Sequence, residues 1–195
     1  MDITLTLCLI IVILLVIKIY NKLIRLRNIC RNSFSQIDVQ LKRRHDLIPN
    51  LVEVTKGYMK YERETFEAVI KARNEATSAI KELNSKRLLS ANAMAGVAGA
   101  ESNLNNALSQ LFALVEGYPE LKANEAMQNL MEDLRSTENR IAFARQVYND
   151  AVMNYNTRCE LFPHFFVAKL FNFSTAPLFE LDNESERAAI NLTFS

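Results

Sequence analysis

The first twenty residues constrain this chain more than any other part of its sequence. Between residues 3 and 17 only three side chains are polar, and all three are small: Thr4, Thr6 and Cys8. The apolar run continues past Lys18 to Tyr20, and a helix of about 18 residues covers roughly 27 Å, close to the hydrocarbon thickness of a bilayer. The run is apolar on every face, unlike the helices of a soluble core. We therefore predict a membrane-spanning helix over residues 3–20.

The charges beside the run predict its orientation. No Asp or Glu occurs between residues 3 and 37, where the sequence carries five cations instead: Lys18, Lys22, Arg25, Arg27 and Arg31. Cationic flanks stay on the cytoplasmic side. A cleaved signal peptide would place its charges before the run and a small-residue cleavage site after it, and neither pattern is present. We expect the N-terminus outside a cell membrane crossed once, and everything after Tyr20 in the cytoplasm.

The composition of the remainder indicates one helical domain. About 175 residues follow the run, with few glycines and prolines and many helix formers. The net charge of +1 gives no reason to expect nucleic acid as a partner. The three cysteines, Cys8, Cys30 and Cys159, form no C-x-x-C pair, so we expect no disulfide framework, in agreement with a reducing compartment.

Residues 127–162 carry the strongest helical pattern. Eleven positions alternate three and four residues apart over about five heptads: Met127, Leu130, Leu134, Thr137, Ile141, Ala144, Tyr148, Ala151, Tyr155, Arg158 and Phe162. Only Thr137 and Arg158 are not apolar, and Cys159 offers an apolar alternative to Arg158. This spacing predicts a long, coiled-coil-like helix in a bundle.

Two further helices precede it. An apolar stripe from Ile37 to Leu83 keeps a helical period, and Pro49 should kink this helix without ending it. A shorter stripe predicts a helix over residues 101–116. Residues 85–100 contain two glycines among Ser, Ala and Asn, which favours a loop. Gly117-Tyr118-Pro119 is typical of a tight turn between helices, and a short helix follows Pro163 up to Phe173.

The predicted fold is therefore all-α: a transmembrane helix over residues 1–20, then an antiparallel bundle over residues 21–173, and an irregular tail over residues 174–195. The bundle comprises three long helices and a short C-terminal one. From helical rise alone, we expect the turn at Tyr118 to lie beside residues 43–50. The same reasoning places Phe162-Pro163 and the tail at the end of the bundle away from the membrane.

Several long segments resemble one known family. Residues 36–64 read QIDVQLKRRHDLIPNLVEVTKGYMKYERE, residues 118–124 read YPELKAN, residues 137–149 read TENRIAFARQVYN, and residues 154–156 read NYN. With the N-terminal apolar run, they resemble the LemA family of bacterial membrane proteins. The likeness covers nearly the whole chain up to Phe173, while the ending INLTF departs from the proline-containing stretch expected there.

The resemblance implies architecture more than activity. A LemA-like protein has a small extracellular N-terminus, one transmembrane helix and a cytoplasmic antiparallel helical bundle. The family brings no biochemical activity that could be carried over to this chain. Some members are thought to act beside membrane proteases or envelope-stress systems, which gives an alternative function as a regulatory partner of such a system.

The sequence offers little catalytic chemistry. His45 follows two arginines and precedes Asp46, but adjacent side chains on a helix point about 100° apart, so Asp46 is badly placed to orient the ring. The chain has one other histidine, no zinc-ligand spacing, no Glu-x-x-His pair and no phosphate-binding glycine motif. We predict no catalytic residue, no metal and no cofactor, and a structural or interfacial role for His45.

The remaining polar residues have structural interpretations. Charges near Arg63 on the first long helix are expected to pair with charges near Glu138 on the third, because buried charges need partners. The asparagines of the last long helix are Asn139, Asn149, Asn154 and Asn156. They favour either hydrogen bonds between helices or an exposed binding face, and the sequence leaves both open.

These observations predict a membrane-anchored scaffold or interaction protein on the cytoplasmic face, not an enzyme. Its expected partners are membrane lipid around residues 3–20 and another protein, with self-association as a further mode. The proline kink, the tight turn and the aromatic tail provide the candidate surface: Arg43, Arg44, His45, Asp46, Asn50, Tyr118, Glu120, Lys122, Asn124 and Phe171.

Overall fold

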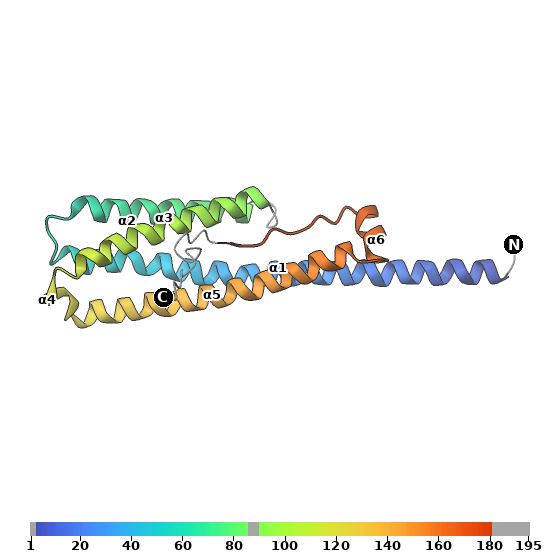
Figure 1. Cartoon of the computed structure of the whole chain (residues 1–195), viewed down its shortest axis with the longest axis horizontal. Coiled ribbons are helices and arrows are strands. Elements are labelled where there is room, and N and C mark those ends of the chain that lie inside the picture. Colours follow the sequence, from blue (N-terminus) through green and yellow to red (C-terminus); the bar gives the residue numbers. More distant parts are fainter. Residues whose placement is uncertain (1–2, 86–89, 181–195) are drawn as a thin grey trace, which may run out of the picture. The chain divides into compact units, whose positions relative to one another are not determined.

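The computed structural model describes residues 3–85 and 90–180, and all of their regular structure is helical. The helices are α1 (Ile3–Lys56), α2 (Arg63–Ser85), α3 (Ala91–Val115), α4 (Pro119–Lys122), α5 (Glu125–Glu160) and α6 (His164–Leu170), as Figure 1 shows. The prediction of an all-α fold with a helical bundle is confirmed. Predicted features within residues 86–89 and 181–195, including most of the tail, lie outside the described residues.

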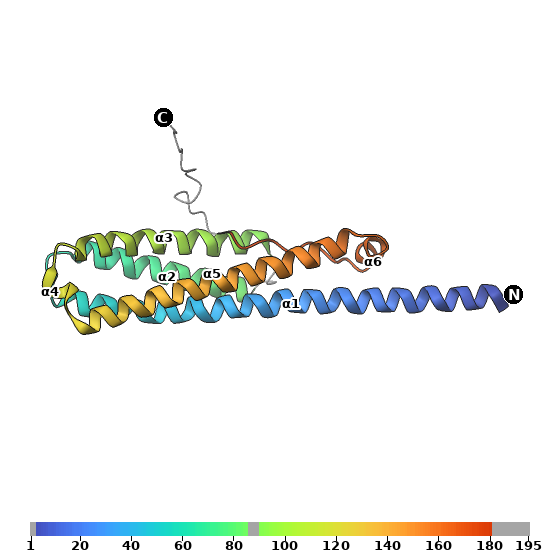
Figure 2. The same cartoon turned by 60° about the horizontal axis from the view of Figure 1, so that its bottom comes forward.

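The chain divides into two compact units, and both α1 and α5 contribute to each. Unit 1 contains the described residues 3–40 and 140–178, and unit 2 contains residues 41–85, 90–139 and 179–180. In unit 2, α2 and α3 lie side by side (Figure 1 and Figure 2). The core between them and the end of α1 includes Leu51, Val69 and Leu104, all fully buried. Each such side chain contributes roughly 1.5–3 kcal/mol through removal from water.

The first predicted bundle helix is in fact two helices. After Lys56 the backbone turns through residues 57–62, and the N–H groups of Tyr58 and Met59 both donate to the carbonyl of Thr55. Met59 is fully buried, so the chain enters the core at this point and reverses direction into α2. The prediction of one helix through to Leu83 is therefore wrong. Pro49 lies inside α1 without ending it, as expected.

The third helix begins ten residues earlier than the sequence suggested. α3 starts at Ala91, so the predicted loop is wrong from that residue onward. Gly96 and Gly99 lie on the exposed face, while Met94 and Val97 are buried. Each helical glycine costs about 1 kcal/mol relative to alanine, and the burial of the apolar stripe offsets that cost. The turn at residues 117–119 is confirmed, with Pro119 opening α4.

The heptad pattern of residues 127–162 identifies most of the residues that α5 buries. Seven of its positions are buried: Met127, Leu134, Thr137, Ile141, Ala144, Tyr148 and Tyr155. Near the end of the helix Cys159 is buried and Arg158 is only half-buried, so the apolar alternative occupies the seam. Asn124 caps the start of the helix, because its Oδ1 accepts a hydrogen bond from the N–H of Met127 at 3.1 Å.

In unit 1, α5 runs antiparallel to α1. The ring of Tyr148 packs against Phe34, with ring centroids 5.7 Å apart, and Phe171, which follows α6, packs against Tyr20 at 4.9 Å. Going from Tyr148 to Phe171 along the chain, the contacted residue of α1 moves back from Phe34 to Tyr20. The expectation that the chain from Phe162-Pro163 onward lies at the end of the bundle away from the apolar start of α1 is wrong for Phe171. The extra reversal at residues 57–62 turns the last long helix round, so that it returns towards the start of α1.

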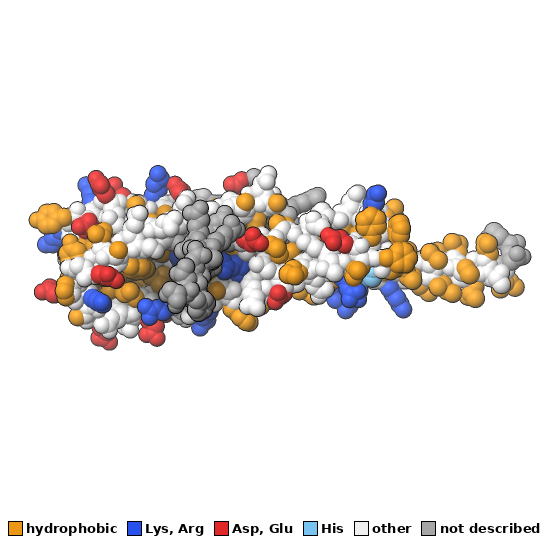
Figure 3. All heavy atoms as spheres, in the orientation of Figure 1, with side chains coloured by type: hydrophobic (Ala, Val, Ile, Leu, Met, Phe, Trp, Pro, Cys, Tyr) orange, Lys and Arg blue, Asp and Glu red, His pale blue; other side chains and the backbone are white. Residues whose placement is uncertain are grey.

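The N-terminal part of α1 is exposed and apolar throughout. Within the part of the chain that the structure describes, α1 is the one helix long and apolar enough to cross a membrane. Only 6% of its most apolar 18-residue window is buried, and Figure 3 shows this segment covered almost entirely by hydrophobic side chains. A buried core helix would have its apolar residues covered by the rest of the protein.

Candidate functional site

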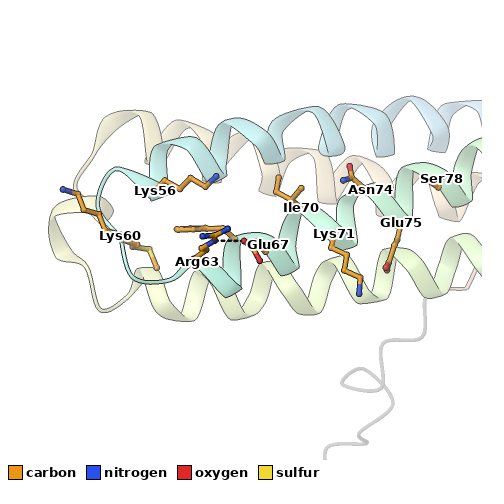
Figure 4. A pocket seen from close by; sticks show the side chains of 11 residues that line it. Lys56, Lys60, Arg63, Glu67, Ile70, Lys71, Asn74, Glu75 and Ser78 are labelled. Atoms are coloured by element: carbon orange, nitrogen blue, oxygen red, sulfur yellow. Dashed lines mark hydrogen bonds and ion pairs between the residues drawn. The ribbon is translucent and has the colours of Figure 1, made fainter.

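A groove of about 1000 Å³ lies in unit 2, where the end of α1, the turn at residues 57–62 and one side of α2 meet (Figure 4). Its lining residues come from all three segments: Lys56, Met59, Lys60, Arg63, Phe66, Glu67, Ile70, Lys71, Asn74, Glu75 and Ser78. The groove combines an apolar floor with charged side chains around it, which is the usual composition of a protein or ligand site.

The floor of the groove is formed by Met59, Phe66 and Ile70. Met59 is fully buried, Phe66 is nearly so, and Ile70 is partly exposed. The ammonium group of Lys56 lies 6.0 Å from the centroid of the Phe66 ring, within the range of a cation–π contact. An apolar side chain inserted here would therefore contact both the ring and the aliphatic part of a lysine.

The charges around the groove are predominantly positive. Arg63 pairs with Glu67 through Nε and Oε1 at 2.7 Å, one turn apart on α2. This pair is the dashed contact in Figure 4. It replaces the cross-helix pairing that the sequence suggested for Arg63. Three exposed lysines and a single further acid, Glu75, remain among the lining residues, so the groove favours an acidic occupant.

Sequence reasoning missed this groove because it treated the reversal as a continuous helix. Phe66 and Ile70 were assigned to a seam that ran on from α1. The available signal was Gly57, followed by two tyrosines and one lysine in the next five residues, because glycine commonly stands just past the end of a helix. Reading Gly57 as a helix end would have placed Lys56 and Arg63 on opposite sides of a turn.

His45 lies in a buried polar network in unit 2. Its Nε2 is 2.7 Å from Oε1 of Glu101 on α3, and its Nδ1 is 3.2 Å from the hydroxyl of Thr77 on α2. His45 is 3% exposed and Glu101 is fully buried. A buried carboxylate is costly unless it is paired, so the histidine and Glu101 stabilise each other across two helices. His45 and Glu101 are 56 residues apart in sequence, so no local pattern suggested this pair.

Arg44 extends the network to α5. Its Nη1 lies 3.0 Å from Oε2 of Glu138 and 3.8 Å from Oε2 of Glu101, and its Nη2 donates to Oδ1 of Asn105. The Arg44 side chain is 7% exposed. This corrects the placement of two predicted surface residues: Arg44 and His45 belong to the interior of unit 2, where they hold α3 and α5 against α1.

A proline explains one further contact of this network. Proline has no backbone N–H, so Pro49 cannot donate to the carbonyl of His45 four residues earlier. The Nε of Arg73 on α2 donates to that carbonyl instead, at 3.1 Å. The freed helix carbonyl thereby becomes an attachment point between α1 and α2.

The order of groups around His45, a carboxylate, an imidazole and a hydroxyl, is also the order in a nucleophilic triad. Two observations favour a structural role here. The Thr77 hydroxyl lies 2.9 Å from the carbonyl of Arg73 and donates to it. The ring of His45 is almost completely buried and contacts the protein through both nitrogens. A nucleophile, by contrast, must be open to its substrate.

The remaining predicted residues near the kink are exposed. Arg43 pairs with Asp133 on α5 at 3.8 Å, and Asp46 pairs with Arg73 on α2 at the same distance. Asn50 is exposed one turn further along α1. Exposed pairs at this distance contribute little to stability. Partner binding by these three residues stays a prediction.

The turn between α3 and α5 does not lie beside residues 43–50 of α1, where the sequence placed it. Asn124 donates from Nδ2 to the hydroxyl of Tyr58 at 3.1 Å, so this turn meets the turn at residues 57–62 and not residues 43–50. The other predicted residues of this turn differ in exposure: Glu120 and Lys122 are exposed and Tyr118 is half-buried. The structure therefore does not bring the two predicted halves of the surface together.

In unit 1 the chain after α6 is held against α5. The hydroxyls of Tyr148 and Tyr155 donate to the carbonyls of Pro177 and Ser174, at 2.8 and 2.9 Å. Asn156 exchanges two hydrogen bonds with the backbone of Ala176. Burial raises the pKa of both tyrosines, so their hydroxyls stay protonated donors. Asn156 thus has the structural role left open above, while Asn154 is exposed.

Over the described ranges, residues 3–85 and 90–180, no three His, Cys, Asp or Glu side chains are grouped so as to hold a metal ion. The three cysteines are free thiols, and Cys30 and Cys159 are buried. Burial raises the pKa of the Cys30 thiol to about 11, which makes it a poor nucleophile and a poor metal ligand at neutral pH.

Comparison with known proteins identifies the family. The model of the LemA family matches residues 33–194, which include the bundle, α6 and the segment after α6 that is hydrogen-bonded to α5. The chain belongs to the LemA family. Its curated relatives include Magnetosome protein MamQ 2 and Magnetosome protein MamQ 1 of Paramagnetospirillum magneticum, each 27% identical over 175 residues. Magnetosome protein MamQ of Magnetospirillum gryphiswaldense is 27% identical over 174 residues.

These relatives are longer than this chain. The matches cover 83% of the chain for the first two and 82% for the third, but only 64% of each relative. Family membership and the exposed apolar helix together make this LemA-family chain a membrane-associated protein.

Proposed function

We propose that this LemA-family protein is a membrane-anchored helical scaffold that recruits another protein through the groove between α1 and α2. The observation that carries the proposal is the groove itself. Its apolar floor is partly exposed at Ile70, and three lysines surround it with one further acid, Glu75, among its lining residues. The occupant we propose is an acidic, amphipathic segment of a partner protein.

The orientation follows from the charges near the end of the apolar run. The five cations between residues 18 and 31 lie in a stretch without Asp or Glu, and such stretches remain in the cytoplasm. The N-terminus is then outside and both α-helical units lie on the cytoplasmic side. The groove faces the compartment in which soluble partners are available.

The chemistry of the groove fits helix-in-groove recognition. In that mode, apolar anchors on one face of a peptide helix enter an apolar groove. Such an anchor would contact Ile70, which is partly exposed beside the buried Met59 and Phe66, while Glu or Asp beside the anchor would meet Lys56, Lys60 and Lys71. Complementary charge at the rim increases the association rate and selects the partner.

We further propose that binding, and not catalysis, is the activity of this site. A catalytic site needs a positioned acid, base or nucleophile at the place where substrate binds. The polar lining of the groove consists of three lysines, Arg63, Asn74, Ser78 and the carboxylates of Glu67 and Glu75, and the lining contains no histidine or cysteine. The triad-like group at His45 is internal and serves the packing of the bundle.

Site-specific photo-crosslinking in cells tests this proposal. A photoreactive residue at Asn74 lies in the groove, and one at Asn103 on the exposed face of α3 is the control position. We expect Asn74 to capture a defined protein through a peptide that carries several Asp or Glu residues beside apolar ones. Asn103 should not capture that protein.

Charge reversal then separates specific recruitment from incidental capture. The variant Lys60→Glu/Lys71→Glu changes two groove lysines, and Lys42→Glu/Lys81→Glu changes two exposed lysines outside the groove. We expect the first variant to lose most of the capture from Asn74 and the second to keep it. Equal capture in both variants, or a crosslinked peptide without acidic residues, would contradict the proposal.

A further inference from the structure

The segment around α6 exposes an unusual density of large apolar side chains. Phe162 is 81% exposed, Phe166 is 63% exposed and Leu170 is 72% exposed. Leu161 and Phe165 are also exposed, at nearly half of their surfaces. Clustered apolar residues of this size on a protein surface mark a site that is covered in the cell. Figure 3 shows hydrophobic side chains gathered over α6.

The position of α6 indicates what covers it. The ring of Tyr20 lies 4.9 Å from Phe171 and 5.6 Å from Phe173, both edge to face. Tyr20 is also the last residue of the apolar run that we predict to span the membrane. Tyrosine at such a position marks the boundary between acyl chains and headgroups. The chain leaving α6 therefore packs against α1 at the level of the membrane surface.

We propose that α6 is a second membrane contact of this protein, lying in the interface of the leaflet from which α1 emerges. Phe166 and Leu170 enter the boundary between headgroups and acyl chains, with Phe162 and Phe165 beside them. A helix with one apolar face binds membranes in this way, with that face buried about 5–10 Å into the boundary.

The charges near α6 agree with this placement. Lys22 and Arg25 on α1 and Lys169 on α6 are exposed, and all three belong to unit 1. Arg27 stacks over the ring of Phe173, with its guanidinium carbon 5.1 Å from the centroid. Lysine and arginine near the membrane surface are attracted to anionic headgroups. The apolar cluster thus has cations close to it that suit the headgroup layer.

The opposite side of α6 is fixed to the protein. Val167 and Ala168 are buried, and the segment that follows is hydrogen-bonded to Tyr155 and Asn156 on α5. A helix held in this way presents its apolar face without further ordering, so little conformational entropy opposes its insertion. The proposal concerns lipid contact in unit 1 and does not depend on the groove in unit 2.

A single-tryptophan experiment tests this inference, because the natural sequence contains no tryptophan. Phe166→Trp places a reporter on the exposed face of α6, and Leu170→Trp provides a second one if the first perturbs folding. Tyr61→Trp is the control, since Tyr61 is 95% exposed in the turn of unit 2. The full chain is reconstituted in vesicles of phosphatidylcholine and phosphatidylglycerol, with and without lipids brominated near the headgroup.

We expect the α6 reporters to emit at shorter wavelengths than the control and to lose roughly half of their fluorescence to shallow brominated lipid, as interfacial burial requires. Tyr61→Trp should be quenched by aqueous iodide instead. Water-like emission from both α6 reporters would overturn the proposal. Blue-shifted emission without quenching by brominated lipid would also overturn it, since protein, such as a second copy of the chain, would then cover α6.

Discussion

Replacing Pro49 by alanine should change how much Arg73 contributes to stability. The N–H of alanine can donate to the carbonyl of His45 in the regular helical pattern, whereas in the natural chain that carbonyl accepts from Arg73 Nε at 3.1 Å. The two donors then compete for one acceptor. The free energy lost on removing the Arg73 guanidinium should therefore depend on whether residue 49 is proline.

The expected magnitudes follow from the environment of each group. A hydrogen bond from a charged group contributes about 1.5–3 kcal/mol, and the pair with Asp46 adds little because Asp46 is mostly exposed. We expect Arg73→Met to cost about 2 kcal/mol in the natural chain and about 1 kcal/mol less when residue 49 is alanine. Pro49→Ala alone should stabilise the protein by up to about 3 kcal/mol, the cost of a proline inside a helix.

A double-mutant cycle in detergent measures this coupling. The four proteins are the natural chain, the two single variants and the double variant, with helical circular dichroism followed during thermal unfolding. A coupling of about 1 kcal/mol corresponds to a difference of roughly 2–4 °C between the Tm shifts in the two backgrounds. Lys81→Met on the exposed side of α2 is the matched control. If Arg73→Met lowers Tm equally in both backgrounds, the missing N–H of Pro49 does not explain the contact between Arg73 and the carbonyl of His45.

Two further predictions concern unit 1. Asn156→Ala removes both hydrogen bonds to Ala176 and should increase hydrogen exchange at residues 174–176 several-fold, whereas Asn154→Ala, on an exposed position, should leave it unchanged. Burial first, and then Arg158 and Lys22, lower the pKa of His164, so the unfolded chain binds its proton more tightly than the folded chain does. The free energy of unfolding is therefore highest above the ordinary pKa of about 6.5 and decreases as the pH falls through it. His164→Gln should make Tm depend less on pH between pH 7 and pH 5.

The parts of the fold that the sequence predicts well carry local signals. The apolar run at residues 3–20 forms the exposed, apolar start of α1, and the heptads of α5 place Tyr148 and Tyr155 correctly in the core. The turn at Gly117 and Pro119 has the residue types that end and begin helices. Each of these features depends on residues close together in sequence, so no tertiary information was needed.

The buried network could not be predicted in the same way. His45 and Glu101 are 56 residues apart, and their pairing depends on the start of α3 at Ala91. Two glycines in the first turns of α3 favoured a loop, and the burial of Met94 and Val97 outweighs that local preference. With Glu101 assigned to a loop boundary, the sequence had no basis for bringing a carboxylate to the histidine.

The reversal at residues 57–62 has the largest consequences, because it changes the number of long helices from the predicted three to four. With three long helices after the membrane, the last one would run away from the bilayer and carry the aromatic tail with it. The reversal makes α1, α2, α3 and α5 four long helices, so α5 runs antiparallel to α1 and brings Phe171 to Tyr20. The same turn also creates the groove around Met59. The assignment of Gly57, as mid-helix or as a helix end, thus decides between a C-terminal region far from the start of α1 and the membrane-surface helix proposed above. The emission of Phe166→Trp distinguishes the two arrangements.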